Sequence, residues 1–199
     1  MAEGREPLLL TVNCAALPPD VLDIELPADG HLLFFTDLEY PPESSMVLHV
    51  SAGAQTTEQA ATYELDGETI PVRFYEPHTL YPVVGLTLEN NWHCAAPETL
   101  TFLDGDGDPN VLGDFEDAVL DMAFGGTRPA VRVQIGGFCD PWDMVPWDIA
   151  PDAGDLVLFA QMHAQAIDYE EGPTLSLIVG TREDIAARRY ANLQYEQQT

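Results

Sequence analysis

The sequence predicts an α+β fold built mainly from antiparallel sheet, and three observations lead to that prediction. Short apolar segments separated by turn residues outnumber segments with helical periodicity. Asp66-Gly67 lies between two strand-like segments, which is the pattern of a two-residue β-hairpin. Only two segments carry the spacing and capping residues of a helix. Because 199 residues is a usual length for one domain, we expect a single domain over residues 1–199.

Strands are predicted where a short apolar run adjoins a turn signal. The strands predicted in this way are residues 8–13, 31–36, 46–51, 83–88, 98–103, 131–135, 156–162 and 174–180. The run 156–162 is apolar except at Gln161, which is typical of a central strand covered on both faces. We expect residues 174–180 to be its hairpin neighbour.

The hairpin at Asp66-Gly67 is predicted to join residues 61–65 to residues 69–75. In the second arm, Ile70, Val72 and Phe74 occupy alternate positions, so we expect them on one face directed into the core. Pro71 in the same arm indicates an edge strand, because proline cannot donate a hydrogen bond to a sheet.

Two short helices complete the predicted elements. The first covers residues 114–124, where Asp114 can cap the N-terminus, apolar residues recur at helical spacing, and Gly125-Gly126 ends the helix. The second is predicted to begin after Thr181 and to continue through about Asn192. Its opening, Thr181-Arg182-Glu183-Asp184, is close to a capping box with Asp in place of the usual Glu.

An internal similarity connects the two ends of the chain. In both regions a buried strand leads through a polar loop and a turn to a second buried strand. The first pair is residues 8–13 and 32–35, and the second pair is residues 156–163 and 175–179. Two interpretations stay open: two pseudo-repeated halves of one domain, or two unrelated hairpins that look alike.

Five segments share their order and character with a known family. They are PLLLTVNCAALPPD, LPADGHLLFFTD, VQIGGFCDPWDMVPW, DLVLFAQMHAQ and TLSLIVGTREDIAARRYANLQ. The matching residues are Pro27, Asp29, Gly30, Leu33, Phe34, Phe35, Gly136, Gly137, Phe138, Leu158, Ala160, Gln161, Asp184, Ile185, Ala186, Arg188, Arg189 and Tyr190. In these features the chain resembles the YwqG-like family of uncharacterised bacterial proteins, with residues 52–110 unmatched and Cys139 where the family more often has proline. The resemblance implies an α+β fold and a cytoplasmic bacterial protein, and it implies no catalytic residues.

Acidic residues dominate the charge of the chain. There are 34 Asp and Glu against 7 Arg and no Lys, which gives a formal net charge of -27. Because negative charge repels phosphate groups, nucleic acids and anionic membranes are not expected as partners. The first residues carry no basic region followed by an apolar one, so we expect a cytoplasmic protein. Two explanations of the acidity stay open: adaptation to a saline cytoplasm, or docking on a basic partner.

Asp104, Asp106 and Asp108 alternate with glycine and are candidate metal ligands. Carboxylates at every second residue can converge on one calcium ion when the backbone curls around it. The helix–loop–helix calcium template, counted from Asp104, needs glycine at its sixth position and glutamate at its twelfth, where this chain has Pro109 and Phe115. We therefore expect an acidic turn with weak calcium affinity at most, and no resident cofactor.

A catalytic arrangement is not evident in the sequence. Cys14, Cys94 and Cys139 form no C-x-x-C pair, and no base or orienting group lies at a recognisable spacing from any of them. We expect these cysteines to be buried and unreactive. The sequence leaves the enzyme question open but favours a protein without catalytic activity.

The run from Asp140 to Asp148 is the candidate partner-binding surface. It combines two tryptophans and a methionine with acidic residues, a composition that suits a basic protein through cation–π contacts and charge. The candidate binding residues are Trp142, Asp143, Met144, Trp147 and Asp148. The alternative is that the tryptophans fold back over the sheet as a lid.

The functional hypothesis is therefore an acidic, non-enzymatic protein-binding protein, with an immunity or accessory role beside a basic partner as its concrete form. The alternative is an enzyme or a binder of small ligands or divalent cations, with a carboxylate-lined pocket between the hairpins. The sequence does not specify the oligomeric state.

Overall fold

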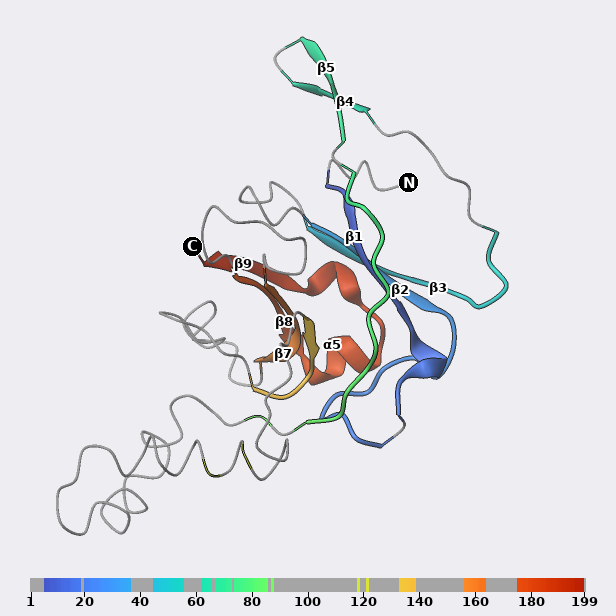
Figure 1. Cartoon of the computed structure of the whole chain (residues 1–199), viewed down its shortest axis with the longest axis vertical. Helices are drawn as coiled ribbons and strands as arrows, with labels where there is room; N and C mark the ends of the chain where they lie inside the picture. The colour runs from blue at the N-terminus through green and yellow to red at the C-terminus, as the bar shows by residue number, and fades with distance from the viewer. Residues whose placement is uncertain are drawn as a thin grey trace, which may run out of the picture.

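The computed structural model describes residues 6–18, 20–36, 45–55, 62–65, 67–72, 74–85, 87, 118, 121, 133–138, 156–163 and 175–198 of the chain. These residues form a three-stranded and a four-stranded antiparallel sheet, a separate two-stranded hairpin and short helical segments (Figure 1). The predicted α+β fold with mainly antiparallel sheet is confirmed.

The three-stranded sheet has the strand order β1–β2–β3. Its strands are Leu8–Asn13 (β1), His31–Phe35 (β2) and Met46–Val50 (β3), which confirms the three strands predicted for this region. In the central strand β2, Leu32 and Phe34 are fully buried, whereas the other three residues of the strand are partly exposed. This alternation is what a strand with one face on the core produces.

The four-stranded sheet has the order β6–β7–β8–β9. Its strands are Val133–Ile135 (β6), Leu156–His163 (β7), Leu175–Thr181 (β8) and Gln194–Gln198 (β9). Strand β7 pairs with β6 on one side and β8 on the other, and its residues 158–162 are all buried. The prediction of a central strand covered on both faces, with β8 as its hairpin neighbour, is confirmed.

The main core lies between the two sheets. In β7 the register shifts between Leu158 and Ala160, and this bulge directs both Phe159 and Ala160 into the core. The ring of Phe159 lies 5.7 Å from that of Phe34 in the first sheet and 5.5 Å from that of Tyr190, measured between centroids. Burial raises the pKa of Tyr190 to about 12. The opposite face of the second sheet carries a separate buried cluster of Leu158, Leu175, Leu177 and Val179.

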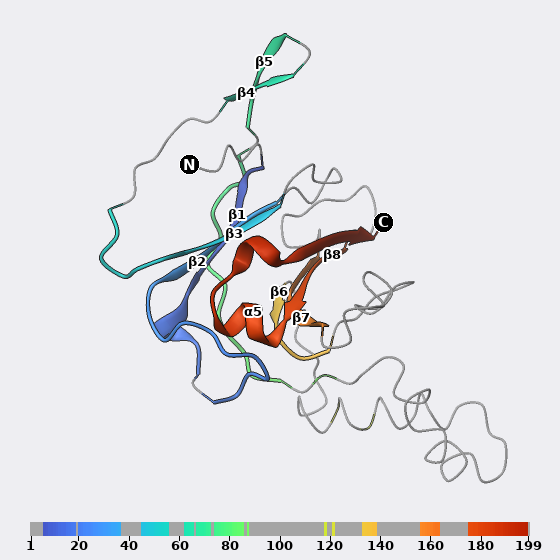
Figure 2. The same cartoon turned by 180° about the vertical axis from the view of Figure 1, so that it is seen from behind.

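The segment after β8 fills the space beside both sheets (Figure 2). Helix α5 (Arg182–Ala186) begins where the Thr181 hydroxyl accepts a hydrogen bond from the amide of Asp184, so the predicted cap is confirmed. The predicted length is wrong, because α5 ends at Ala186 and is followed by the 3-10 helix η3 (Tyr190–Asn192). Arg188 stops the helix with a φ of 58°, and the amides of Arg188 and Arg189 bond back to α5 carbonyls.

A further 3-10 helix, η1 (Cys14–Ala16), follows β1 and leads into the connection to β2. The side chain of Asn13 caps it by accepting a hydrogen bond from the amide of Ala15. Of the predicted helix over residues 114–124, only Ala118 and Asp121 belong to the described part of the chain, and both are helical.

The predicted hairpin is present as β4 (Thr62–Leu65) and β5 (Glu68–Pro71), and it stands apart from both sheets (Figures 1 and 2). The expectation that Phe74 faces the core is wrong, because β5 ends at Pro71 and Phe74 is 79% exposed. A strand at residues 83–88 is also not formed by the described residues of that range, and Val83 and Val84 are exposed. Pro77 and Pro82 precede these valines, and each removes a backbone donor from the segment.

Candidate functional site

The residues predicted for partner binding and for metal binding lie outside the described residues. This holds for Trp142, Asp143, Met144, Trp147 and Asp148, and for Asp104, Asp106 and Asp108. Among the residues that the structure does describe, no three His, Cys, Asp or Glu side chains are grouped to hold a metal ion. The described residue next to the tryptophan-containing run is Phe138, which ends a glycine turn after β6.

This glycine turn is the best-defined polar site in the described part of the chain. Gly136 and Gly137 have φ values of 69° and 75°, in the left-handed region that favours glycine. A Cβ atom on Gly137 would lie 2.4 Å from Oγ1 of Thr87, and one on Gly136 would lie 2.7 Å from Oδ1 of Asp23. Two consecutive glycines are therefore required both by the backbone conformation and by the close approach of these side chains.

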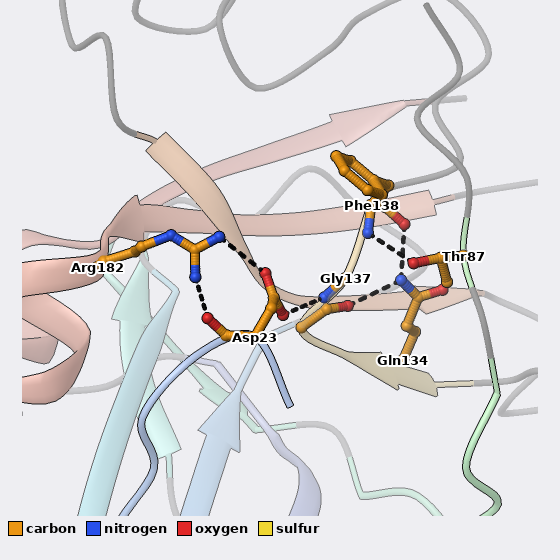
Figure 3. A network of polar contacts seen from close by, with 7 residues as sticks. Asp23, Thr87, Gln134, Gly137, Phe138 and Arg182 are labelled. Carbon is orange, nitrogen blue, oxygen red and sulfur yellow. Dashed lines mark hydrogen bonds and ion pairs between the residues drawn. The ribbon is translucent and has the colours of Figure 1, made fainter. Parts of the chain in front are cut away.

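Asp23 holds the turn from the side of the first sheet (Figure 3). Its carboxylate accepts a hydrogen bond of 2.6 Å from the amide of Gly137 and forms an ion pair of 3.1 Å with Arg182 Nη2. Nη1 of Arg182 donates to the backbone carbonyl of Asp23. One aspartate thus connects the η1–β2 connection, the end of β6 and the start of α5.

Thr87 and Gln134 hold the turn from its other side (Figure 3). The amide of Phe138 donates to Thr87 Oγ1 at 2.9 Å, and Nε2 of Gln134 donates to the carbonyls of Gly136 and Phe138 at 2.9 and 2.7 Å. Gln134 in turn accepts a hydrogen bond of 3.1 Å from Gln161, its register partner on β7. Both backbone polar groups of Phe138 are fixed, while its half-exposed ring points away from the network.

The side chains of this network fix the position of the backbone at the turn. Its carboxylate is paired with a guanidinium group, and its other side chains are amides and a hydroxyl, which supply neither a nucleophile with a base nor an acid–base pair. What the network does provide is a fixed position for Phe138, two residues before the Asp140–Asp148 run begins. We call the group formed by Asp23, Thr87, Gln134, Gly137, Phe138 and Arg182 the anchor network.

The connection between η1 and β2 carries acidic side chains away from the core. Leu22, Ile24 and Leu26 pack against the main core at alternate positions, as in an extended segment with one buried face. The acidic residues of this connection are all exposed, and they are Asp20, Asp23, Glu25 and Asp29. The anchor network therefore lies at the edge of an acidic surface.

Cys14 is the one cysteine within the described residues, and it is buried. Burial raises the pKa of its thiol, which suppresses the thiolate that a nucleophile requires. The expectation that the cysteines are buried is confirmed for Cys14. Cys94 and Cys139 lie outside the described residues.

Sequence reasoning missed most of the anchor network. Asp23, Thr87 and Arg182 are separated by long stretches of chain, and no spacing rule brings them together. The sequence feature that could have located the turn is Gly136-Gly137 directly after an alternating strand, since paired glycines indicate a backbone that needs positive φ.

Comparisons with known proteins add no relative: no protein-family model matches the chain, and no curated protein matches it. The resemblance to the YwqG-like family therefore stays a prediction. Within the described residues, no helix has the length and apolar character needed to cross a membrane.

Proposed function

We propose that this chain is a non-enzymatic acidic protein that binds a basic protein in the cytoplasm, with an immunity or accessory role as the concrete form. The observation that carries the proposal is the net charge of -27, because a surface with few cations of its own attracts a cationic one.

The few arginines do little to offset this charge at the surface. Arg182 pairs with Asp23, and Arg189 pairs with Asp184 at 2.5 Å and with Glu183 at 2.7 Å. Two of the three described arginines are thus already engaged with carboxylates of the same chain. The exposed carboxylates of Asp20, Glu25 and Asp29 lie on the connection beside the anchor network.

The Asp140–Asp148 run is the proposed contact segment, with Trp142 and Trp147 as its aromatic anchors. Aromatic side chains combined with carboxylates suit the arginine and lysine side chains of a basic protein. The anchor network supports this role because it fixes Phe138, from which the chain continues into the run.

Affinity capture from the native lysate, followed by mass spectrometry, tests the proposal. Three baits are compared: the wild-type chain, the acidic-surface variant Glu25→Gln plus Asp29→Asn, and the matched variant Glu68→Gln plus Asp121→Asn. Both variants remove two negative charges from exposed positions. We expect the wild-type chain to capture a protein of basic isoelectric point. The acidic-surface variant should capture less of this protein than the matched variant does. Capture of a neutral or acidic protein only would contradict the proposal, whereas equal capture by all three baits would show that the acidic connection is not part of the contact surface.

A further inference from the structure

Large apolar side chains are exposed along one segment that has neither helix nor strand. Phe74, Tyr81 and Val83 are 79%, 83% and 68% exposed, and Leu80 and Val84 are about half exposed. We call these five residues the apolar strip. Other exposed large apolar side chains in the described part of the chain are far apart in the sequence, such as Leu8, Val21 and Leu48. Single exposed apolar residues are normal, whereas a run of them marks an interaction surface.

The apolar strip leads directly to the anchor network. The segment leaves the β4–β5 hairpin and passes beside β1 in both views (Figures 1 and 2). Thr87 follows it three residues after Val84. Thr87 accepts the hydrogen bond from Phe138, whose ring is itself half-exposed. Asp23 accepts a hydrogen bond from the neighbouring Gly137, so the acidic connection between η1 and β2 contacts the same turn. The segment that carries the apolar strip and the acidic connection are therefore both fixed to the same glycine turn.

Charge selects among the partners that could cover such a surface. A second copy of the chain would bring another net charge of -27 against the first, which disfavours self-association. Residues 74–84, which include the apolar strip, contain Glu76 and His78 and neither arginine nor lysine, and Arg73 precedes them. A partner with apolar and cationic side chains on one face would satisfy both surfaces.

We propose that the apolar strip is a docking site for a basic amphipathic segment of another protein, its apolar side chains on Phe74, Tyr81 and Val83 and its cations on exposed carboxylates of the chain. The inference rests on the proposed function, and it adds the recognition surface and the kind of segment that this surface takes. In this mode of binding, an amphipathic segment lies on an apolar surface. Burial of its apolar side chains provides the affinity, and the charges set its orientation.

Two synthetic peptides provide the probe. One is a short amphipathic peptide of lysine and leucine, and the other has the same lysines with serine in place of leucine. Their affinities are measured by calorimetry at about 0.05 M salt, where electrostatic attraction is only partly screened. The chains compared are the wild type, the strip variant Phe74→Ser plus Tyr81→Ser plus Val83→Ser, and the control variant Leu8→Ser plus Val21→Ser plus Leu48→Ser. All six positions are exposed.

The expected result is that the wild type binds the lysine–leucine peptide at least about tenfold more tightly than the lysine–serine peptide. The strip variant should lose this preference while still binding the lysine–serine peptide, and the control variant should keep the preference. If both peptides bind equally well, or if the strip variant keeps the preference, the docking site is overturned while the proposed function stands. If neither peptide binds the wild type, electrostatic recognition fails, and the proposed function and the docking site fail with it.

Discussion

Gly136 and Gly137 show how single residues control the shape of the candidate site. Both have left-handed φ values, and the space that a side chain would need is occupied by Thr87 and Asp23. The hydrogen bonds that hold Phe138 depend on this close approach, because a longer distance would break the contact between Thr87 and the Phe138 amide.

Replacement of Gly137 by alanine is expected to lower the free energy of unfolding by about 1–2 kcal/mol from the left-handed backbone alone, with a further loss from the clash with Thr87. The matched substitution is Gly53→Ala, since a Cβ there would meet nothing within 4 Å and Gly53 has no positive φ. Urea unfolding should separate the two variants, with Gly53→Ala close to the wild type. Equal midpoints for both would show that the turn is not constrained as described.

Arg188 has a backbone conformation that is unfavourable for any residue with a Cβ atom. It ends α5 with a φ of 58°, where glycine is the usual residue. The variants Arg188→Gly and Arg188→Ala remove the same charge and differ only in the cost of this conformation. We expect the glycine variant to be more stable by about 1 kcal/mol in chemical denaturation. An alanine variant that is as stable as the glycine variant would contradict the left-handed helix stop.

At the scale of elements, the local apolar pattern was sufficient to predict the three strands of the first sheet and strands β6, β7 and β8 of the second, but β9 (Gln194–Gln198), which carries no apolar run, was not predicted. Leu32 and Phe34 alternate with less buried neighbours in β2, and the apolar run of β7 corresponds to burial on both faces. Elements were predicted wrongly where a nonlocal or conformational effect overrode the pattern. The second helix was expected to reach Asn192, but Arg188 adopts a conformation that a propensity-based interpretation does not include. Phe74 and the following valines have strand-forming composition, yet they pair with no described strand.

The end of α5 carries an ion pair that links stability to pH. Hydrogen bonds from Arg189, and also from Asn192 and Thr181, hold the pKa of the Asp184 carboxyl below its usual range. A carboxyl whose pKa is lower in the folded state stabilises the fold above its unfolded-state pKa, and the contribution is lost as the pH falls through the folded-state pKa. We expect Asp184→Asn to be less stable than the wild type at pH 7, with a difference that shrinks below about pH 4. Unfolding curves at both pH values check this, and a difference that is constant with pH would rule out the ion pair as its source.

At the scale of the whole molecule, the excess of carboxylates is expected to influence stability and, in the proposed function, recognition. With 34 acidic residues and 7 arginines, most carboxylates have no cation to pair with. Their mutual repulsion destabilises the compact state and is strongest where salt does not screen it.

Stability is therefore expected to rise with salt. The Debye length falls from about 30 Å at 0.01 M to about 8 Å at 0.15 M, so repulsion between surface carboxylates is largely screened over this range. The melting temperature should increase between these two concentrations, with the effect the same for sodium and potassium chloride. A melting temperature that stays constant or falls would show that repulsion between carboxylates does not limit stability.

The candidate surface could be predicted only in part from the sequence. The charge of -27 is a property of composition and needs no structure. The anchor network could not be predicted, because it joins Asp23, Thr87 and Arg182 through contacts that depend on how the sheets and α5 come together. The exposure of Phe74 and Tyr81 could not be predicted either, since large apolar side chains are usually buried.

The central claim, recognition of a basic protein by charge, is tested most directly by the salt dependence of binding. The captured partner is purified, and its dissociation constant with the wild-type chain is measured between about 0.05 and 0.5 M sodium chloride. Screening opposes attraction between unlike charges, so the dissociation constant should rise at least about tenfold over this range. A dissociation constant that does not change with salt would contradict electrostatic docking as the basis of binding.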